Sequence, residues 1–175
     1  MSIDPEPRFL GYTRARPDQL SSTPDRPLNK TPFVITEYVR WGDIDLAGII
    51  CYGAYIRFYE LAETEIFRAA GLPFGEMFER FDVWLPRKVM HTEFHTPARL
   101  DERLKVVTYF SHVGRTSLTI NFDVMSADDN TLHASAYQVL VCVSRSRFEK
   151  VPLPSELVRA IEPFVMDSAQ ARHAA

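Results

Sequence analysis

Two aspartates stand one residue apart in the stretch WGDIDLAGIICYGAY, residues 41–55, and a glycine follows the second by three positions. This spacing admits two kinds of chemistry. Asp43, Asp45 and Gly48 match positions 1, 3 and 6 of a calcium-binding loop of the EF-hand type. Alternatively, a carboxylate just before a helix is placed to attack a carbonyl carbon or to activate a water molecule.

The calcium interpretation fails on the number of oxygen ligands. An EF-hand loop needs an oxygen ligand at position 5 and a bidentate glutamate at position 12, but Ala47 and Ala54 stand there. The five histidines are scattered and show no zinc-binding spacing. We therefore expect no metal ion and no other cofactor.

Composition sets the class of protein. A chain of 175 residues with 46% hydrophobic and 25% charged residues fits one globular domain. Its net charge of −3 argues against nucleic acid as a partner. The two cysteines suit reduced thiols, and we find neither a signal peptide nor a membrane-spanning stretch. We expect a cytoplasmic protein without a membrane partner.

The chain divides into three parts. Six of its 12 prolines fall in residues 1–32, which we expect to be an arm that is disordered or draped over the domain. Residues 33–166 form the predicted domain. Residues 167–175 are expected to be a frayed tail.

Within the domain, the hydrophobic pattern changes from one strand to a helix and then to strands. Apolar residues recur at three- and four-residue spacing over residues 52–70, which predicts a long helix. A helical or irregular turn at 74–82 and a short helix from Pro154 to about Phe164 complete the prediction. The predicted strands are Phe33–Trp41, Val83–Thr96, Arg103–Val113, Ser117–Ser126 and Thr131–Ser144. This order predicts an α+β fold in which an antiparallel sheet packs on one long helix.

A family resemblance rests on the segment from Val39 to Glu65. Its pattern, R-W-G-D-I-D-x-x-G followed by Tyr52, Tyr55 and the pair Tyr59-Glu60, resembles the hotdog-fold acyl-CoA thioesterases. The segment is most similar to the 4-hydroxybenzoyl-CoA thioesterase branch and its YbgC-like relatives. This resemblance implies a five-stranded antiparallel sheet wrapped around the helix. It also implies a homodimer with active sites at the interface, or a homotetramer built from such dimers.

The resemblance further implies that Asp45, and not Asp43, is the essential carboxylate. Asp45 would act as a nucleophile or as a general base, and the sequence leaves both mechanisms open. Gly48 would let the backbone turn, and free N–H groups at the helix start near Tyr52 would polarise the thioester carbonyl. Without the resemblance, Asp45 would be interpreted as a turn or helix-cap aspartate. For Asp43 we favour a turn-stabilising or solvated role.

Glu63 falls inside the apolar stripe of the predicted helix. One interpretation makes it an auxiliary catalytic acid, because other hotdog thioesterases place a carboxylate on this helix. The interpretation that we favour is a structural glutamate paired with an arginine at the dimer interface, because a buried charge needs a partner.

Substrate-binding candidates follow from the same resemblance. Arg115, in a turn between two strands, matches a basic position that would hold the phosphates of coenzyme A, and Arg87, Lys88, Arg145 and Arg147 are weaker candidates. The candidates for lining the acyl pocket are aromatic: Trp41, Tyr55, Phe58, Tyr59, Trp84 and Phe94. Aromatic residues at strand spacing are also typical of an ordinary core.

Two other functions remain as alternatives. The first is an acyl-CoA-binding protein without catalysis, since a fold alone does not fix a function. The second is a hotdog hydratase or dehydratase, which generally uses a histidine near the helix start. No histidine stands at that position here.

Overall fold

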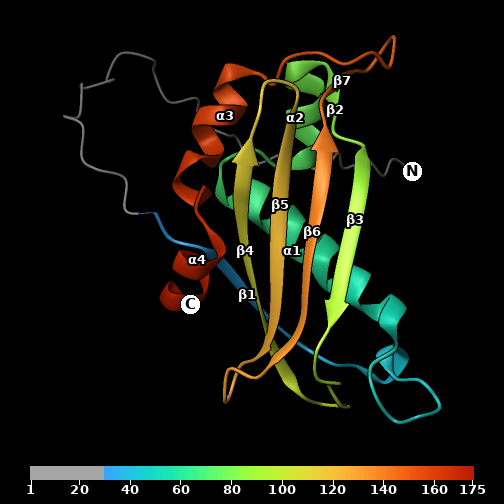
Figure 1. Ribbon diagram of the computed structural model, residues 1–175. Helices are drawn as coiled ribbons and strands as arrows, with labels where there is room; N and C mark the ends of the chain where they lie inside the picture. Colours follow the sequence, from blue (N-terminus) through green and yellow to red (C-terminus); the bar gives the residue numbers. More distant parts are fainter. Residues whose placement is uncertain (1–29) are drawn as a thin grey trace, which may run out of the picture.

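The computed structural model describes residues 30–175 (Figure 1). All but the last three residues of the expected arm, 1–32, lie outside the described residues. Within the described part, one five-stranded sheet and one long helix dominate the architecture, and every pair of neighbouring strands in the sheet is antiparallel. The predicted α+β class is therefore confirmed.

The sheet has the strand order β1-β4-β5-β6-β3. Its strands are β1 (Phe33–Tyr38), β3 (Arg87–Phe94), β4 (Arg103–Val113), β5 (Ser117–Ser126) and β6 (Leu132–Val141). The bounds of β4 and β5 are those predicted, because a turn signal flanks each alternating run. The first strand ends three residues earlier than predicted, since the chain turns into a 3-10 helix at Trp41–Asp43.

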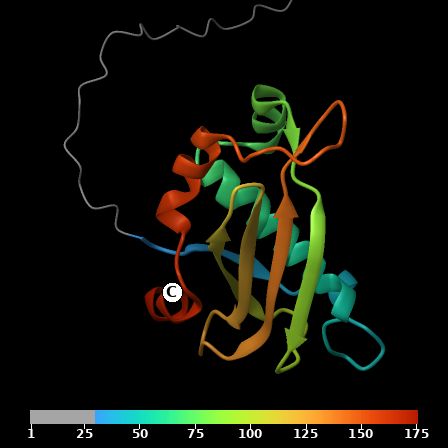
Figure 2. The same ribbon diagram turned by 45° about the horizontal axis from the view of Figure 1, so that its top comes forward.

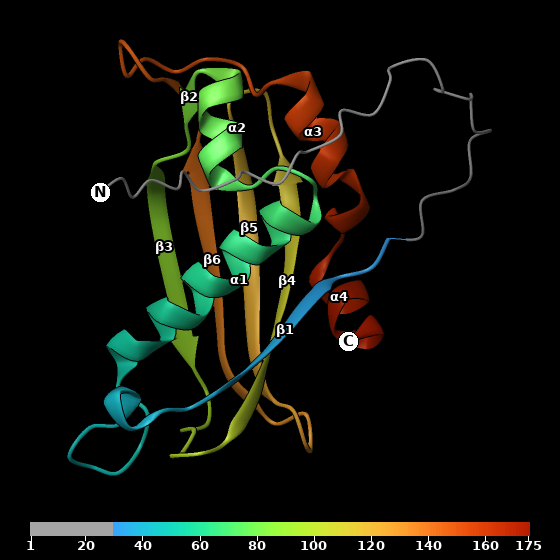
Figure 3. The same cartoon turned by 180° about the vertical axis from the view of Figure 1, so that it is seen from behind.

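Helix α1 (Tyr55–Ala69) crosses one face of the sheet, as Figure 3 shows from behind. A 3-10 turn at Tyr52–Ala54 precedes it, so the helical segment begins where the sequence predicts. Five α1 side chains are at most 1% exposed and form the stripe that faces the sheet: Phe58, Tyr59, Ala62, Ile66 and Phe67. They pack on fully buried sheet residues such as Phe110, Ile120 and Phe122, which explains why the helix and the sheet form one core.

The predicted strands Val83–Thr96 and Thr131–Ser144 are each broken in two. β2 (Val83–Trp84) pairs with β7 (Val143–Ser144) in a separate small sheet, beside helix α2 (Phe74–Phe81) at the end seen coming forward in Figure 2. Pro86 cannot donate a ladder hydrogen bond, and its carbonyl accepts one from the Val141 N–H at 3.0 Å. The chain therefore leaves the main sheet at this point.

The expectation of a frayed tail was wrong for residues 168–174, which form helix α4 (Ser168–Ala174). Asp167 caps it, because its carboxylate accepts the Gln170 N–H at 2.8 Å. Arg172 then binds the buried Asp123 of β5 through two hydrogen bonds of 3.0 and 2.8 Å. Before it, α3 (Ser155–Ile161) and a 3-10 turn at Glu162–Phe164 form the predicted short helix.

No helix in residues 30–175 has the length and apolar character needed to cross a membrane.

Candidate active site

Asp45 lies in a short loop whose two ends are joined by a β-bridge between Ile44 and Ile50. The Asp45 N–H donates to the Ile49 carbonyl, and the Asp45 carbonyl accepts from the Gly48 N–H, both at 3.0 Å. Its carboxylate accepts the Ala47 N–H at 2.8 Å and is otherwise exposed. Gly48 adopts a φ of 72°, a conformation that glycine adopts without steric cost. The carboxylate is thus fixed by its own turn and open to a ligand.

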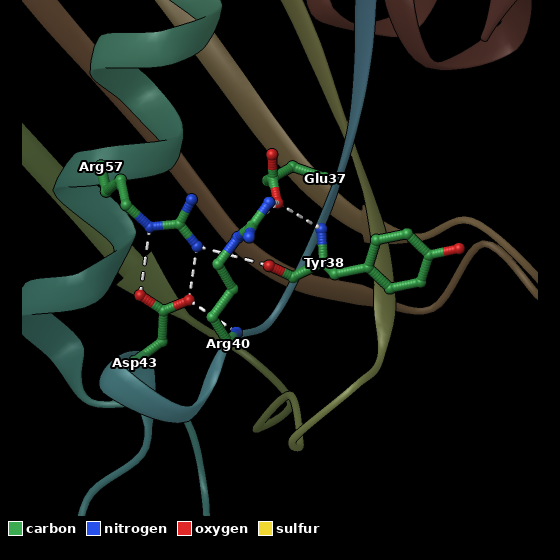
Figure 4. Close-up of polar contacts among 5 residues, drawn as sticks. All are labelled: Glu37, Tyr38, Arg40, Asp43 and Arg57. Atoms are coloured by element: carbon green, nitrogen blue, oxygen red, sulfur yellow. Dashed lines mark hydrogen bonds and ion pairs between the residues drawn. The ribbon is translucent and has the colours of Figure 1, made fainter.

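Asp43 connects the start of this loop to α1 and to Arg40 (Figure 4). Its side chain is nearly buried and forms an ion pair with Arg57 of α1, and it also accepts the Arg40 N–H at 2.8 Å. Its carbonyl accepts the Cys51 N–H at 2.7 Å. Burial by itself would raise the pKa of this carboxyl, but the Arg57 and Arg40 contacts outweigh it and lower the pKa. Asp43 therefore stabilises the turn, as favoured from the sequence.

An open and mostly apolar hollow of about 710 Å³ lies against the Asp45 loop. It is lined by Trp41, Ile44, Asp45, Leu46, Gly48 and Leu100. Three residues selected from the sequence, Trp41, Asp45 and Gly48, are thus brought together. Trp41 and Leu46 are highly exposed, with relative accessibilities of 82% and 108%. Exposed apolar side chains gathered at a hollow are typical of a surface that binds a ligand or another protein.

The start of the helical segment leaves backbone N–H groups free. Within residues 30–175, the amides of Tyr52 and Gly53 have no hydrogen-bond acceptor, whereas the Ala54 N–H bonds to the Cys51 carbonyl at 2.9 Å. Free amides at a helix start attract a developing negative charge. The Tyr52 side chain is 77% exposed and does not line the hollow.

Two of the aromatic candidates are buried below the hollow. Tyr55 and Tyr59 are 3% and 1% exposed, and burial raises the pKa of each to about 12. The Tyr59 ring stacks on Phe122 with 5.0 Å between ring centroids, and the Tyr55 ring lies 5.3 Å from that of Phe94. The structure therefore places both tyrosines in the core beneath the site. Phe58 is also fully buried.

Glu63 is 2% exposed and forms an ion pair with Arg87 of β3 in the same chain. Arg87 also donates to the Gln138 side chain at 2.7 Å. Burial raises the pKa of the Glu63 carboxyl, and Arg87 partly opposes that effect. This pairing matches the structural role favoured from the sequence, although the arginine belongs to the same chain and not to a partner.

Strand β2, which carries Trp84, and the turn between β4 and β5, which carries Arg115, lie at the opposite end of the sheet from the loop that precedes α1 and carries Asp45 (Figure 1). Trp84 carries the Arg145 guanidinium over its ring at 4.7 Å, and Arg115 is exposed in the turn between β4 and β5. One chain by itself therefore does not bring the two phosphate-binding candidates, Arg115 and Arg145, to the Asp45 hollow. Lys88 and Arg147 are exposed as well.

Sequence reasoning missed the apolar walls of the hollow. Leu100 stands between the charged residues Arg99 and Asp101, and a leucine flanked by two charges was the available signal. Ile44 lies between the two aspartates and Leu46 follows Asp45, and neither was selected as a site residue from the sequence. Only the folded structure shows that Ile44, Leu46 and Leu100 line the same hollow.

Comparison with known proteins identifies relatives that share this site region. A family model described as the thioesterase-like superfamily matches residues 39–161. The acyl-CoA thioester hydrolase YbgC of Escherichia coli O6:H1 is 30% identical over 131 residues, which cover 75% of this chain and 96% of that protein. The acyl-CoA thioesterase YbgC of Haemophilus influenzae is 28% identical over 123 residues, covering 70% of this chain and 88% of the relative.

Solved structures confirm the fold. A 1,4-dihydroxy-2-naphthoyl-CoA thioesterase from Synechocystis superposes with a TM-score of 0.69 at 22% identity, covering 74% of this chain and 95% of that chain. A thioesterase-superfamily protein from Jannaschia sp. CCS1 has a TM-score of 0.71 at 25% identity, covering 82% and 99%. The sheet, the helix it wraps and the matched residues 39–161 together show the hotdog fold expected from the sequence, and the chain belongs to the thioesterase-like superfamily.

Proposed function

We propose that the protein hydrolyses the thioester bond of an acyl-CoA to a free acid and coenzyme A, with Asp45 as the essential carboxylate. The observation that carries this proposal is the exposed Asp45 carboxylate at an apolar hollow, in the loop that leads into a helix start with free amides. The two YbgC relatives, which are named as acyl-CoA thioester hydrolases, support the same reaction.

The chemistry can follow two routes from this geometry. As a nucleophile, a carboxylate oxygen of Asp45 attacks the thioester carbon, the coenzyme A thiolate leaves, and water hydrolyses the resulting anhydride. As a general base, Asp45 takes a proton from the water that attacks. A single turnover in ¹⁸O-labelled water places the label in the Asp45 carboxylate when water attacks the Asp45 carbon of the anhydride, and the general-base route never does so; label in Asp45 therefore establishes the nucleophilic route.

The hollow suits the acyl group better than the coenzyme A moiety. None of the six residues that line it in the described part of the chain is cationic, so these residues offer no partner for phosphates. Its apolar wall of Ile44, Leu46 and Leu100 favours a hydrocarbon or aromatic acyl group through burial of apolar surface. Trp41 adds an aromatic face at the same hollow.

A second copy of the chain would supply the missing basic groups. Strand β3 is a sheet edge in the described part of the chain, and seven of its eight residues are exposed, including Val89, Met90 and Phe94. An exposed edge strand offers its unpaired backbone N–H and C=O groups to another strand. We infer that two copies form a homodimer by antiparallel pairing of their β3 strands.

This pairing would unite the two halves of the site. The loop that carries Asp45 lies near the end of β3 at Phe94, whereas β2 and the turn between β4 and β5, which carries Arg115, lie toward its start at Arg87 (Figure 1). A two-fold axis through the middle of β3 reverses the strand in the second copy. The Arg115 end of that copy would then lie toward Asp45 of the first copy, where it could hold the phosphates.

The decisive experiment is a thiol-release assay with short-chain, long-chain and aromatic acyl-CoA substrates. Asp45→Asn should lower kcat by at least about a hundredfold, as loss of a catalytic base or nucleophile does, while leaving the unfolding transition unchanged. Asp128→Asn is the matched control, because that carboxylate is 72% exposed and lies outside the hollow. Turnover by Asp45→Asn equal to that of the wild type would refute the proposal.

The same assay separates the alternatives. Tight coenzyme A binding without thiol release from any substrate would favour the binding protein. Hydration of an enoyl-CoA without thiol release would favour the hydratase.

The dimer is tested by light scattering coupled to size-exclusion chromatography. Met90→Glu, at the middle of β3, should convert a dimer into a monomer and reduce turnover together. Val34→Glu, on the opposite edge strand, is the control, because the two side chains have similar exposures of 39% and 44%. A Met90→Glu protein that stays dimeric would exclude pairing through β3.

A further inference from the structure

The segment 95–102, which joins β3 to β4, forms one wall of the candidate active site. Leu100 lines the hollow beside Asp45. The Ala98 carbonyl accepts the Ile50 N–H at 2.9 Å. The position of this segment therefore determines both the wall of the hollow and the place where the Asp45 loop ends.

His133 of β6 holds this segment against the sheet. Its carbonyl accepts the N–H groups of His95 and Thr96 at 2.8 and 3.4 Å. Its imidazole is 3% exposed, and Nδ1 lies 2.9 Å from the Thr96 carbonyl oxygen. A carbonyl oxygen only accepts hydrogen bonds, so Nδ1 must carry a hydrogen.

The other ring nitrogen faces a carboxylate. Nε2 has no aligned hydrogen-bond partner in the described part of the chain, yet Oε1 of Glu102 lies only 2.8 Å from it. The second oxygen of Glu102 accepts the Arg99 N–H at 3.0 Å, which fixes the carboxylate in the segment. At 2.8 Å a neutral Nε2 and the carboxylate oxygen would repel each other, whereas a proton on Nε2 turns the contact into an attraction between opposite charges.

Two other ionisable groups stand near the pair. Asp129, in the turn between β5 and β6, is a second carboxylate whose charge interacts with His133. Tyr55, from α1, interacts with the Glu102 carboxylate. Among residues 30–175, no arginine or lysine side chain forms a hydrogen bond or an ion pair with either His133 or Glu102.

We propose that His133 and Glu102 form a proton-dependent positioning pair, which holds segment 95–102 in place as the wall of the Asp45 hollow. The role in catalysis rests on the proposed thioesterase function. With the proton present, an imidazolium and a carboxylate attract across a buried contact. When the proton leaves, this attraction is lost, and the segment that carries Ala98 and Leu100 loosens.

The first test reads the protonation state directly. ¹⁵N NMR of the His133 side chain in the wild-type protein should show hydrogen on both ring nitrogens at the acid end of the range in which histidines change charge, about pH 5 to 8, and loss of the Nε2 hydrogen at its alkaline end. Over the same range, the hydrogen-exchange protection factor of the Ile50 amide should fall. A neutral His133 throughout the range would overturn the proposal.

Glu102→Gln tests the pair without removing its contacts. The glutamine NH₂ can donate to a neutral Nε2 while its oxygen still accepts the Arg99 N–H, so the wall should stay in place at high pH. We expect the KM for acyl-CoA to rise about tenfold with pH in the wild type, as loss of one charge-assisted contact of about 1.4 kcal/mol predicts, with little change in kcat. In Glu102→Gln the KM should stay flat.

Glu149→Gln is the matched control, because Glu149 is 66% exposed and pairs with Arg147 far from this segment. It should keep the pH response of the wild type. An unchanged pH response in Glu102→Gln would refute the pair. Hydrogen exchange of the Ile50 amide can be measured without turnover. If the protein hydrolyses no acyl-CoA but its Ile50 exchange still depends on pH as expected, the proposed function is refuted and the His133–Glu102 pair is supported.

Discussion

Arg57, in the first turn of α1, closes the loop that carries Asp45 by binding Asp43. Its Nε lies 3.1 Å from Oδ1 of Asp43, its Nη2 binds the other carboxylate oxygen, and the same Nη2 reaches the Tyr38 carbonyl at 3.3 Å (Figure 4). The guanidinium thus joins the helix, the end of β1 and the base of the loop. The exposed carboxylate of Asp45 stands two residues from this junction, so its position depends on Arg57.

Arg57→Ala should therefore reduce both stability and activity. We expect the free energy of unfolding to fall by about 2–3 kcal/mol, because Asp43 is left nearly buried without a counter-ion. This value lies below the range for fully buried pairs, since the Arg57 side chain is 37% exposed. kcat should fall by about ten- to a hundredfold through displacement of Asp45. Urea unfolding and thiol release measure the two effects.

Arg40→Ala is the control for that prediction. Arg40 contacts Asp43 through its backbone N–H, and its own side chain is 67% exposed on a surface pair with Glu37. Removing the side chain should change the free energy of unfolding by less than about 1 kcal/mol. An equal loss of unfolding free energy in Arg40→Ala and Arg57→Ala would mean that the Arg57–Asp43 ion pair contributes no more to stability than a surface pair does.

Lowering the pH should weaken the ion pair between Asp43 and Arg57. The pKa of this carboxyl is lowered in the folded protein, so its contribution to stability is present above the unfolded pKa and is lost as pH falls through the folded value. The wild type should lose this contribution below about pH 4, whereas Asp43→Asn has none to lose. The difference in unfolding free energy between the two proteins should narrow as pH falls from neutrality to about pH 3. A constant difference would contradict the ion pair.

The extent to which the sequence predicts this molecule depends on how local each signal is. The bounds of β4 and β5 and the start of the helical segment follow from turns and periodicity within a few residues. The breaks at Pro86 and after Val141 depend on which carbonyl accepts the Val141 N–H, a partner 55 residues away in the chain. Alternating apolar residues carry no information about such a change of partner.

The same distinction applies to the candidate site. The local pattern placed Asp45, Gly48 and the helix start in one loop. It could not reveal that Leu100 closes the hollow, because the contact joins residues more than 50 positions apart. α4 was missed for another reason: its residues, SAQARHA, are small and polar, and its position depends on Arg172 reaching Asp123 across 49 residues.

The Glu63–Arg87 pair gives a prediction about a carboxyl group whose pKa is raised by folding, whereas the pKa of Asp43 is lowered. Burial raises the pKa of Glu63, so the folded state favours its protonated form, and removing Arg87 raises that pKa further. Arg87→Ala should cost about 2–3 kcal/mol of unfolding free energy at neutral pH, and the cost should shrink toward about pH 5 as Glu63 takes up a proton.

Glu63→Gln is the companion variant, and it separates a structural role from a catalytic one. The amide needs no counter-ion, so we expect near wild-type stability and turnover at neutral pH. Loss of turnover in a folded Glu63→Gln protein would instead assign Glu63 to catalysis. Thiol release and urea unfolding at two pH values provide both measurements.

Gly48 tests whether the conformation of the Asp45 loop matters for activity. An added Cβ at Gly48 would meet no atom within 4 Å, so Gly48→Ala tests the φ of 72° alone, free of any steric clash. We expect a loss of about 1–2 kcal/mol in unfolding free energy, and a lower kcat/KM because the turn that orients Asp45 is strained. Gly48→Asn should lose less, since asparagine tolerates this conformation better than alanine.

Gly75→Ala in α2 is the control for Gly48→Ala. Its added Cβ also meets no atom within 4 Å, but Gly75 has no positive φ, so the substitution should be neutral or should stabilise the fold by up to about 1 kcal/mol. If Gly48→Ala matched Gly75→Ala in stability and in turnover, the left-handed turn would have no part in placing the carboxylate.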